Sequence, residues 1–160
     1  MTDRGGPPPT SPGFVALYRD RYDPMVRLAF LLTSDRAVAE ELVQDAFVKV
    51  HRQWDRGIDH PKAYLRTAVV NTCNSWGRRQ VRERDHHRRR LEAVPDPELV
   101  SDEMGDILDA LAPRQRAAIV LRYYEDLPED DIASVLGCRP GTVRTLIHRG
   151  LRALREEIPR

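Results

Sequence analysis

The sequence has few of the features that mark membrane, secreted or metal-binding proteins. Its longest strongly apolar run is residues 28–32, far short of the roughly 20 residues that a membrane-spanning helix needs. Residues 1–13 are rich in glycine and proline without an apolar stretch, so we expect no signal peptide and a cytoplasmic, nucleoid-associated location. Cys73 and Cys138 lie in separate segments, which favours free thiols over a metal cluster.

The sequence also lacks the patterns that accompany enzyme active sites. It contains no Gly-rich phosphate loop, no nucleophile elbow and no constellation of carboxylates. The pair His86 and His87 lies in a run of arginines and is interpreted as surface, not as a metal site. No segment alternates apolar and polar residues as a strand does. We therefore expect an all-α protein that is not an enzyme and uses no metal, no cofactor and no small-molecule substrate.

Charge is unevenly distributed, although the net charge is only +1. Residues 76–90 hold seven arginines and two acids, residues 93–131 hold eleven acids and three arginines, and residues 132–160 hold six arginines and two acids. The order basic, acidic, basic favours two cationic surfaces separated by an anionic segment. Ordinary solvation of the surface is the alternative explanation for such blocks.

Residues 126–155 have the pattern of two short helices joined by a tight turn. Pro128 suits the first position of a helix, and the three acidic residues after it lie at the positive end of that helix. Gly137 and Cys138 end it, and Pro140 begins the next helix because its φ is already helical. The apolar side of the second helix is formed by Val143, Leu146 or Ile147, Gly150 and Leu154.

A second helix that is apolar inside and basic outside is the geometry of a helix-turn-helix that reads the major groove of DNA. Arginine suits this role because its planar fork matches guanine edges and phosphates. An ordinary helical hairpin with a solvated arginine face is the alternative that spacing leaves open. The candidate DNA-contacting residues are Arg139, Thr142, Arg144, Thr145, His148, Arg149 and Arg152.

The N-terminal half has the apolar spacing of a bundle of helices. The clearest is the third, whose apolar stripe runs from Ala39 to Val50 with a polar face opposite. These helices predict one domain over residues 13–82, after a disordered tail of residues 1–12. The four helices are expected over about residues 14–22, 25–32, 36–54 and 62–79.

The apolar pattern lapses between the two halves, where Pro95 and Pro97 indicate a flexible linker over residues 83–101. Helices resume near residue 102, so a second domain over residues 102–160 is expected to contain four helices, the last two being the helix-turn-helix. The acids in and beside the linker are Glu92, Asp96, Glu98, Asp102 and Glu103.

Three stretches together resemble a known protein family. They are AEELVQDAFVKVHRQW, PKAYLRTAVVNTCNSWGRRQ and LAPRQRAAIVLRYYEDLPEDDIASVLGCRPGTVRTLIHRGLRALR. In this order and across a linker, they resemble the extracytoplasmic-function (ECF, group IV) RNA polymerase sigma factors of bacteria, the short form with regions 2 and 4 only. The resemblance covers residues 14–158. It implies a factor that binds core RNA polymerase, recognises the −35 and −10 promoter elements and helps to open the DNA.

The resemblance implies that one helix docks on the β′ clamp helices of the polymerase, with the β flap as a further contact. An apolar stripe with acids above it suits pairing with basic residues of a partner helix. For Leu42 and Phe47, a place in the hydrophobic core is the alternative. The implied docking residues are Glu41, Leu42, Gln44, Asp45 and Phe47.

The resemblance also implies a site for the melted −10 element. Asn71 matches the position near the loop that captures an unstacked base, and an amide can pair with a Watson–Crick edge. It is either hydrogen-bonded within the fold or exposed to a ligand. Tyr64 and Trp76 offer faces for stacking, with the core as the alternative for each. The implied residues are Tyr64, Asn71, Asn74, Trp76, Arg78 and Arg79.

The sequence departs from the family pattern within the helix-turn-helix. Many members have Ser at the position of Arg139 or Pro128, where its hydroxyl caps a helix. Arg139 cannot accept from backbone N–H groups, a loss of about 1 kcal/mol that the following proline offsets in part. His148 replaces other residue types, so a different base preference is expected.

Both double-stranded and single-stranded promoter DNA are expected partners, an anti-sigma factor is a further candidate, and no membrane is involved. The alternative function is a stand-alone helix-turn-helix regulator that binds duplex DNA as a dimer. An RNA-binding or nucleic-acid-modifying protein is disfavoured by the missing catalytic pattern. Stoichiometric association with core polymerase separates these alternatives.

Overall fold

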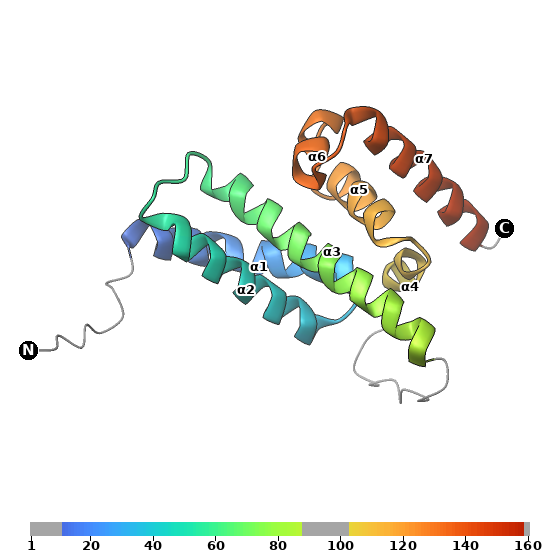
Figure 1. Ribbon diagram of the computed structural model, residues 1–160, viewed down its shortest axis with the longest axis horizontal. Helices are drawn as coiled ribbons and strands as arrows, with labels where there is room; N and C mark the ends of the chain where they lie inside the picture. Colours follow the sequence, from blue (N-terminus) through green and yellow to red (C-terminus); the bar gives the residue numbers. More distant parts are fainter. Residues whose placement is uncertain (1–10, 88–102, 159–160) are drawn as a thin grey trace, which may run out of the picture.

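The computed structural model describes residues 11–87 and 103–158, and these residues form helices and connecting turns without a strand. The all-α fold expected from the sequence is therefore confirmed over the described ranges (Figure 1). The helices are α1 (Pro12–Thr33), α2 (Arg36–Trp54), α3 (Pro61–His87), α4 (Glu103–Asp109), α5 (Pro113–Tyr123), α6 (Glu129–Leu136) and α7 (Pro140–Glu157).

Helices α1, α2 and α3 pack against one another and bury their apolar stripes between them. The turn from α1 to α2 is sharp because Ser34 adopts a left-handed conformation with φ of 57°. Asp35 then caps α2, since its carboxylate accepts a hydrogen bond from the Val38 N–H at 3.1 Å. The fully buried side chains of this layer include Met25, Leu28, Val43, Val50, Leu65, Val69 and Val70.

The expectation of two separate helices before residue 33 is wrong, because α1 runs through Pro24 without a break. A proline in a helix removes one backbone hydrogen bond and normally kinks or ends the helix. Here Leu17 precedes the proline and Met25 and Leu28 follow it, and all three are buried in the same core. Burial on both sides of Pro24 holds the helix together.

Helix α3 is also longer than the apolar pattern indicates. The stripe that predicts the helix stops near residue 79, whereas the helix continues to His87. Residues 78–84 are arginine, glutamine, valine and glutamate, and most of these are favourable in helices without any buried face. Of the predicted tail over residues 1–12, the structure describes only residues 11–12. Of the predicted linker over residues 83–101, it describes only residues 83–87, which belong to α3. The rest of both segments lies outside the described residues.

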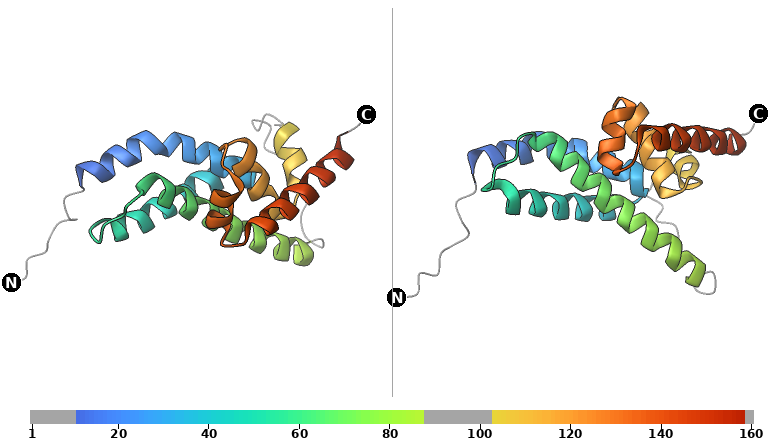
Figure 2. Two further views of the ribbon diagram at one scale, coloured as in Figure 1. Left: turned by 90° about the horizontal axis from the view of Figure 1, so that it is seen from above. Right: turned by 45° about the horizontal axis from the view of Figure 1, so that its top comes forward.

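The second group of helices, α4 to α7, packs directly on the first group (Figures 1 and 2). Helices α5 and α6 contact α3, and α5 also contacts α1. A Cβ added at Gly77 of α3 would lie 3.3 Å from Pro113 of α5, so the two backbones approach closely there. Arg66 of α3 and Glu125 form an ion pair with 3.6 Å between Nε and Oε2.

Arg116 of α5 makes the most extensive polar contact between the two groups. Its side chain is almost completely buried and donates hydrogen bonds to Leu31 O at 2.6 Å and to Ser34 Oγ at 2.7 Å. It also pairs with Asp109 Oδ1 at 2.7 Å. One guanidinium thus ties the α1–α2 turn to α4 and α5, because its several N–H groups can be satisfied from different directions.

Candidate nucleic-acid interface

The helix-turn-helix forms where the sequence predicts it. Helix α6 begins at Glu129 with Pro128 at its N-cap, and the acids of its first turn lie at the positive end of the helix. Gly137 ends α6 in a left-handed conformation with φ of 63°, and the Cys138 N–H donates to Ala133 O at 3.0 Å. Helix α7 then starts at Pro140.

The start of α7 has the weak cap that the sequence indicates. Arg139 occupies the N-cap position and its side chain makes no capping hydrogen bond. The proline in the first turn needs no such bond, because it has no N–H group to satisfy. The backbone N–H groups of Thr142 and Val143 donate to Arg139 O at 2.9 and 3.2 Å.

Close packing on α5 fixes the orientation of α7. Val143 is fully buried, and Gly150 lies so near Ile119 that a Cβ at position 150 would overlap its Cδ1. Gly141 is the opposite case, since a Cβ there would meet no heavy atom within 4 Å. The buried and open sides of α7 are therefore opposite faces of one helix.

The open face of α7 carries six of the seven DNA-contacting residues predicted in the helix-turn-helix, and the seventh, Arg139, directly precedes the helix. Thr142, Arg144 and Thr145 lie in the first two turns, and the Thr145 hydroxyl donates back to Gly141 O at 3.1 Å. The N-terminal residues of a recognition helix are the ones that reach base edges. The exposed members of the predicted set are Arg139, Thr142, Arg144, Thr145, His148, Arg149 and Arg152.

Arg144 has a partner that the sequence analysis did not foresee. Its Nε donates to Glu129 Oε2 at 2.6 Å, which joins the second helix of the motif to the first. This hydrogen bond and the carboxylate charge raise the pKa of Arg144. No local signal could have revealed the pair, since the residues are 15 positions apart and meet only through the turn.

A second polar surface lies in the groove between α2 and α3, which we call the α2–α3 groove. Asn71 is exposed and lines this groove, so it is not buried in the core. Trp76 is half-buried and lines the adjoining part with Arg79. The residues lining the groove are Glu41, Leu42, Asp45, Val48, Lys49, Arg52, Asn71, Thr72, Ser75, Trp76 and Arg79, together with Val38, Gln80 and Glu83.

Other predicted −10 residues lie in different surroundings. Tyr64 is 40% exposed, on the part of α3 near the α2–α3 loop. Arg78 is exposed and donates to Ser75 Oγ at 3.3 Å. Asn74 is only 9% exposed, so its amide is poorly placed to meet an incoming base. Sequence analysis missed Lys49 and Arg52, although their spacing after Asp45 places them on its side of α2.

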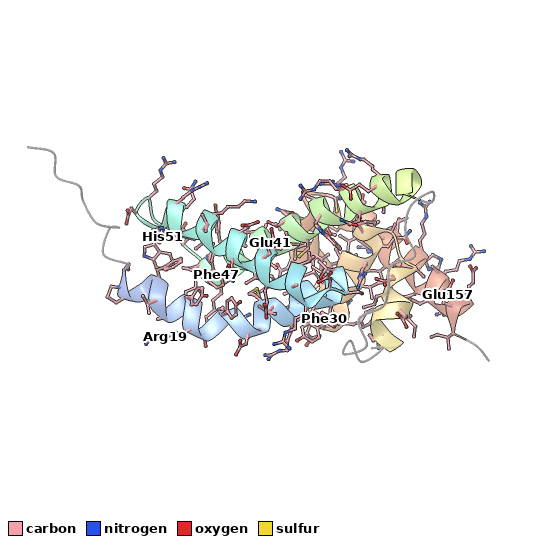
Figure 3. The ribbon with its side chains drawn as sticks, turned by 90° about the horizontal axis from the view of Figure 1, so that it is seen from below. Arg19, Phe30, Glu41, Phe47, His51 and Glu157 are labelled. Carbon is pink, nitrogen blue, oxygen red and sulfur yellow. The ribbon has the colours of Figure 1, made fainter. Side chains whose placement is uncertain are left out.

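The predicted docking residues divide between surface and core. Glu41, Gln44 and Asp45 are exposed on α2, whereas Leu42 is 5% exposed and Phe47 is 3% exposed. Figure 3 shows Phe47 between α1 and α2. Its ring packs edge-on against the ring of Phe14, with the two centroids 6.2 Å apart. It also packs at a tilt against the ring of Tyr18, with the centroids 4.8 Å apart. Phe47 thus occupies the core position that was its alternative.

The described residues contain no cluster of three or more His, Cys, Asp or Glu side chains that could hold a metal ion. In the same part of the chain, no helix is both long enough and apolar enough to cross a membrane. The two free cysteines are Cys73, which is buried, and Cys138, which is half-buried.

Comparison with known proteins identifies the family. The sequence pattern of sigma-70 region 2 matches residues 17–83, and that of sigma-70 region 4 matches residues 101–154. The RNA polymerase sigma-E factor of Streptomyces avermitilis is 36% identical over 91% of this chain and 84% of its own length. This chain belongs to the ECF family of RNA polymerase sigma factors.

Further relatives of this sigma factor agree. The ECF RNA polymerase sigma factor SigE of Mycolicibacterium smegmatis is 32% identical over 96% of this chain and 65% of its own length. The sigma factor RpoE of Bartonella quintana, solved in complex with the anti-sigma factor NepR, superposes with a TM-score of 0.73 at 27% identity. That match covers 94% of this chain and 100% of the other, so the fold is shared nearly throughout.

The family places the two surfaces of this sigma factor in its two regions. The α2–α3 groove lies within the stretch that matches region 2, and the helix-turn-helix lies within the stretch that matches region 4. The family membership implied by the three sequence stretches is therefore confirmed.

Proposed function

We propose that this sigma factor binds core RNA polymerase and directs initiation at promoters by using two separate DNA-contacting surfaces. The observation that carries the proposal is the exposed basic face of α7, held at a fixed angle by the packing of Val143 and Gly150. A rigid helix with arginines outward suits the major groove of a −35 element. The protein performs no chemistry itself, and it acts in the cytoplasm at the nucleoid, where promoter DNA is found.

In region 2, the exposed acids of α2 bind basic residues of the polymerase β′ clamp helices, and the β flap supports region 4. Glu41, Gln44 and Asp45 supply the polar contacts, while Leu42 and Phe47 support the helix from the core. We propose residues 13–82 and 102–160 as the two domains that carry these tasks. An anti-sigma factor, such as the partner of the Bartonella protein, is a proposed further ligand.

The α2–α3 groove is proposed to accept the melted −10 element. Asn71 offers an exposed amide that can both donate to and accept from an extruded base. Arg78 and Arg79 follow on the exposed side of α3 and suit phosphate contacts. Tyr64 and Trp76 are the aromatic faces on this helix for stacking, whereas Asn74 is too buried to contribute without a rearrangement.

Association with core polymerase is the direct test of the proposal. We expect the purified chain to bind core enzyme stoichiometrically, and Asp45→Arg to weaken that binding without a change in helicity by circular dichroism. Asp55→Arg is the matched control, because it makes the same change of charge at an exposed site beyond α2. If the wild-type chain binds promoter DNA alone as a dimer and ignores core enzyme, it is a stand-alone regulator.

Opening of the DNA is tested separately with Asn71→Ala. Unstacking a base costs a few kcal/mol, and the groove returns that energy only after the base is extruded. We therefore expect nearly normal closed complex and reduced open complex, measured by permanganate reactivity of thymines. A promoter with a pre-melted bubble should restore part of the signal. Equal loss of closed and open complexes would give Asn71 a structural role.

A further inference from the structure

Arg144 is distinguished from the other arginines of α7 by a bond to a different helix. Its Nε lies 2.6 Å from Glu129 Oε2 at the start of α6. Arg152 has only a loose pair with Glu156 of its own helix, at 3.9 Å. Within residues 11–87 and 103–158, neither Arg139 nor Arg149 forms an ion pair. Among the candidate arginines of the helix-turn-helix, only Arg144 is thus bound to another helix before DNA arrives.

The bond uses a particular part of the arginine fork. A guanidinium has five N–H groups, of which one is on Nε and four are on the two terminal nitrogens. Because Nε of Arg144 is engaged by Glu129, the terminal nitrogens remain to approach O6 and N7 of a guanine end-on. Arg144 stays 70% exposed in this arrangement, so the anchor orients the side chain without hiding it.

The anchor itself is well fixed. Glu129 is the first residue of α6, where the helix dipole favours a carboxylate, and only 37% of its side chain is exposed. Its negative charge also offsets the positive charge of Arg144. An arginine that already has a carboxylate partner gains less from phosphates than a free arginine, so general affinity for DNA falls while base recognition is retained.

We propose that Glu129 is a specificity-determining residue, which positions Arg144 for one guanine of the −35 element without contacting DNA itself. The inference rests on the proposed function of α7 as the promoter-binding helix. The effect is local to one base pair, because only Arg144 among the α7 candidates is held by α6.

The test uses holoenzyme and a promoter library randomised over the −35 element, with bound promoters selected and sequenced. Arg144→Ala should reduce the preference for guanine at one position by about 5- to 150-fold. Glu129→Ala should remove most of the same preference at the same position, and Glu129→Gln should remove less. In the Arg144→Ala background, Glu129→Ala should change the preference no further.

Glu129→Ala should also increase binding to unrelated promoters and steepen the salt dependence, since a cation has been released for phosphate contact. Glu156→Ala is the matched control, because it removes the partner of Arg152 and should leave the preference unchanged. Glu129→Asp, which keeps the charge at the start of α6, is measured in parallel in case Glu129→Ala does not fold.

Two results separate the inference from the function on which it rests. If the wild-type holoenzyme selects a −35 sequence and both Glu129→Ala and Glu129→Asp select the same sequence equally strongly, Glu129 has no positioning role. If the Glu129 variants lose all promoters alike, their effect is structural and the inference is overturned as well. A wild-type holoenzyme that selects no −35 sequence contradicts the proposed function of α7 instead.

Discussion

Two arginines of this sigma factor, Arg116 and Arg144, differ in burial and in the number of their hydrogen bonds. Arg116 is buried between the two groups of helices, where it bonds Leu31 O, Ser34 Oγ and Asp109. Arg144 is 70% exposed on α7, and among the described residues its side chain has one hydrogen bond, to Glu129. The two side chains differ in their access to water. A buried guanidinium must have its N–H groups satisfied inside the protein, whereas an exposed one can exchange partners with water at little cost.

The buried contacts of Arg116 also affect how the protein reaches its promoter. The −35 and −10 elements are named for positions about 25 base pairs apart, which is about 85 Å along B-form DNA at about 3.4 Å per base pair. Helix α3, with 27 residues, spans only about 40 Å. Because region 4 packs directly on α1 and α3, we expect the two groups of helices to separate when the two proposed surfaces bind both elements. Arg116 would then lose its bonds to the α1–α2 turn.

Replacing Arg116 should have the largest effect on stability. Arg116→Ala leaves Leu31 O and Ser34 Oγ without their donor in the contact between the two groups, and a polar group left unsatisfied in this way typically costs about 1–3 kcal/mol. Denaturant unfolding measures the change, and small-angle scattering should show a larger radius of gyration if the two groups separate before they unfold. Arg116→Lys keeps the charge without the fork and should recover only part of the loss. A cost below about 1 kcal/mol would mean that Arg116 is not the main connection.

The packing of α7 on α5 can be tested by substitutions at two glycines of α7, Gly150 and Gly141. Gly150→Val should cost about 1–3 kcal/mol, because the new side chain overlaps Ile119 and must displace it. Gly141→Ala should be neutral or slightly stabilising, since its Cβ meets only open space and alanine favours a helix. Thermal unfolding measures both changes. Similar effects at the two positions would contradict the close packing of α7 on α5.

The buried thiol of Cys73 should make the stability of the protein depend on pH. Burial raises the pKa of this thiol to about 12, although the charge of Arg116 acts in the opposite direction. Between the ordinary pKa of 9.0 and the raised one, the unfolded chain loses a proton that the folded chain keeps. Stability should therefore fall as the pH rises above 9, by up to about 1.4 kcal/mol per unit. Below pH 9 this group should contribute no slope.

Comparison with Cys73→Ala isolates that contribution, since the two proteins differ only at this position. The variant should have a shallower loss of stability between pH 9 and 11 in denaturant titrations. Equal slopes in the two proteins would place Cys73 in contact with water.

Replacing Arg144 should have the smallest effect on stability. Arg144→Ala removes an exposed side chain, so the free energy of unfolding should change by no more than about 0.5 kcal/mol. Promoter binding should nevertheless fall by about 1–3 kcal/mol at sequences with the recognised base. Arg152→Ala should weaken all promoters alike and reduce the salt dependence. Losses that are equal and independent of sequence for both variants would remove the base-reading role of Arg144.

Much of the fold follows from local patterns in the sequence. The helix-turn-helix was predictable because Gly137 and Pro140 mark its turn, and α2 because its apolar stripe is unbroken. Pro24 misled the prediction of α1, since packing on both sides outweighed the local cost of proline. The end of α3 was missed because helix propensity without burial leaves no apolar stripe.

The sequence was sufficient to predict which residues of the candidate site are exposed, but not which side chains form pairs. Exposure of the α7 arginines follows from helical periodicity. Asn71 was expected to be either hydrogen-bonded within the fold or exposed, and it is exposed. Phe47 was equally compatible with surface and core, and only the positions of Phe14 and Tyr18 decide for the core. The bonds of Arg116 and Glu129 join residues far apart in the chain, which spacing cannot reveal.

Transcription in vitro measures whether this sigma factor confers promoter specificity on core polymerase. Core RNA polymerase and genomic fragments are incubated with and without the protein, and transcript start sites are mapped. We expect new start sites that share one pair of upstream elements and that are lost with Asp45→Arg. Start sites that are unchanged by the protein, or that persist with Asp45→Arg while the protein binds the same fragments without polymerase, would contradict this function.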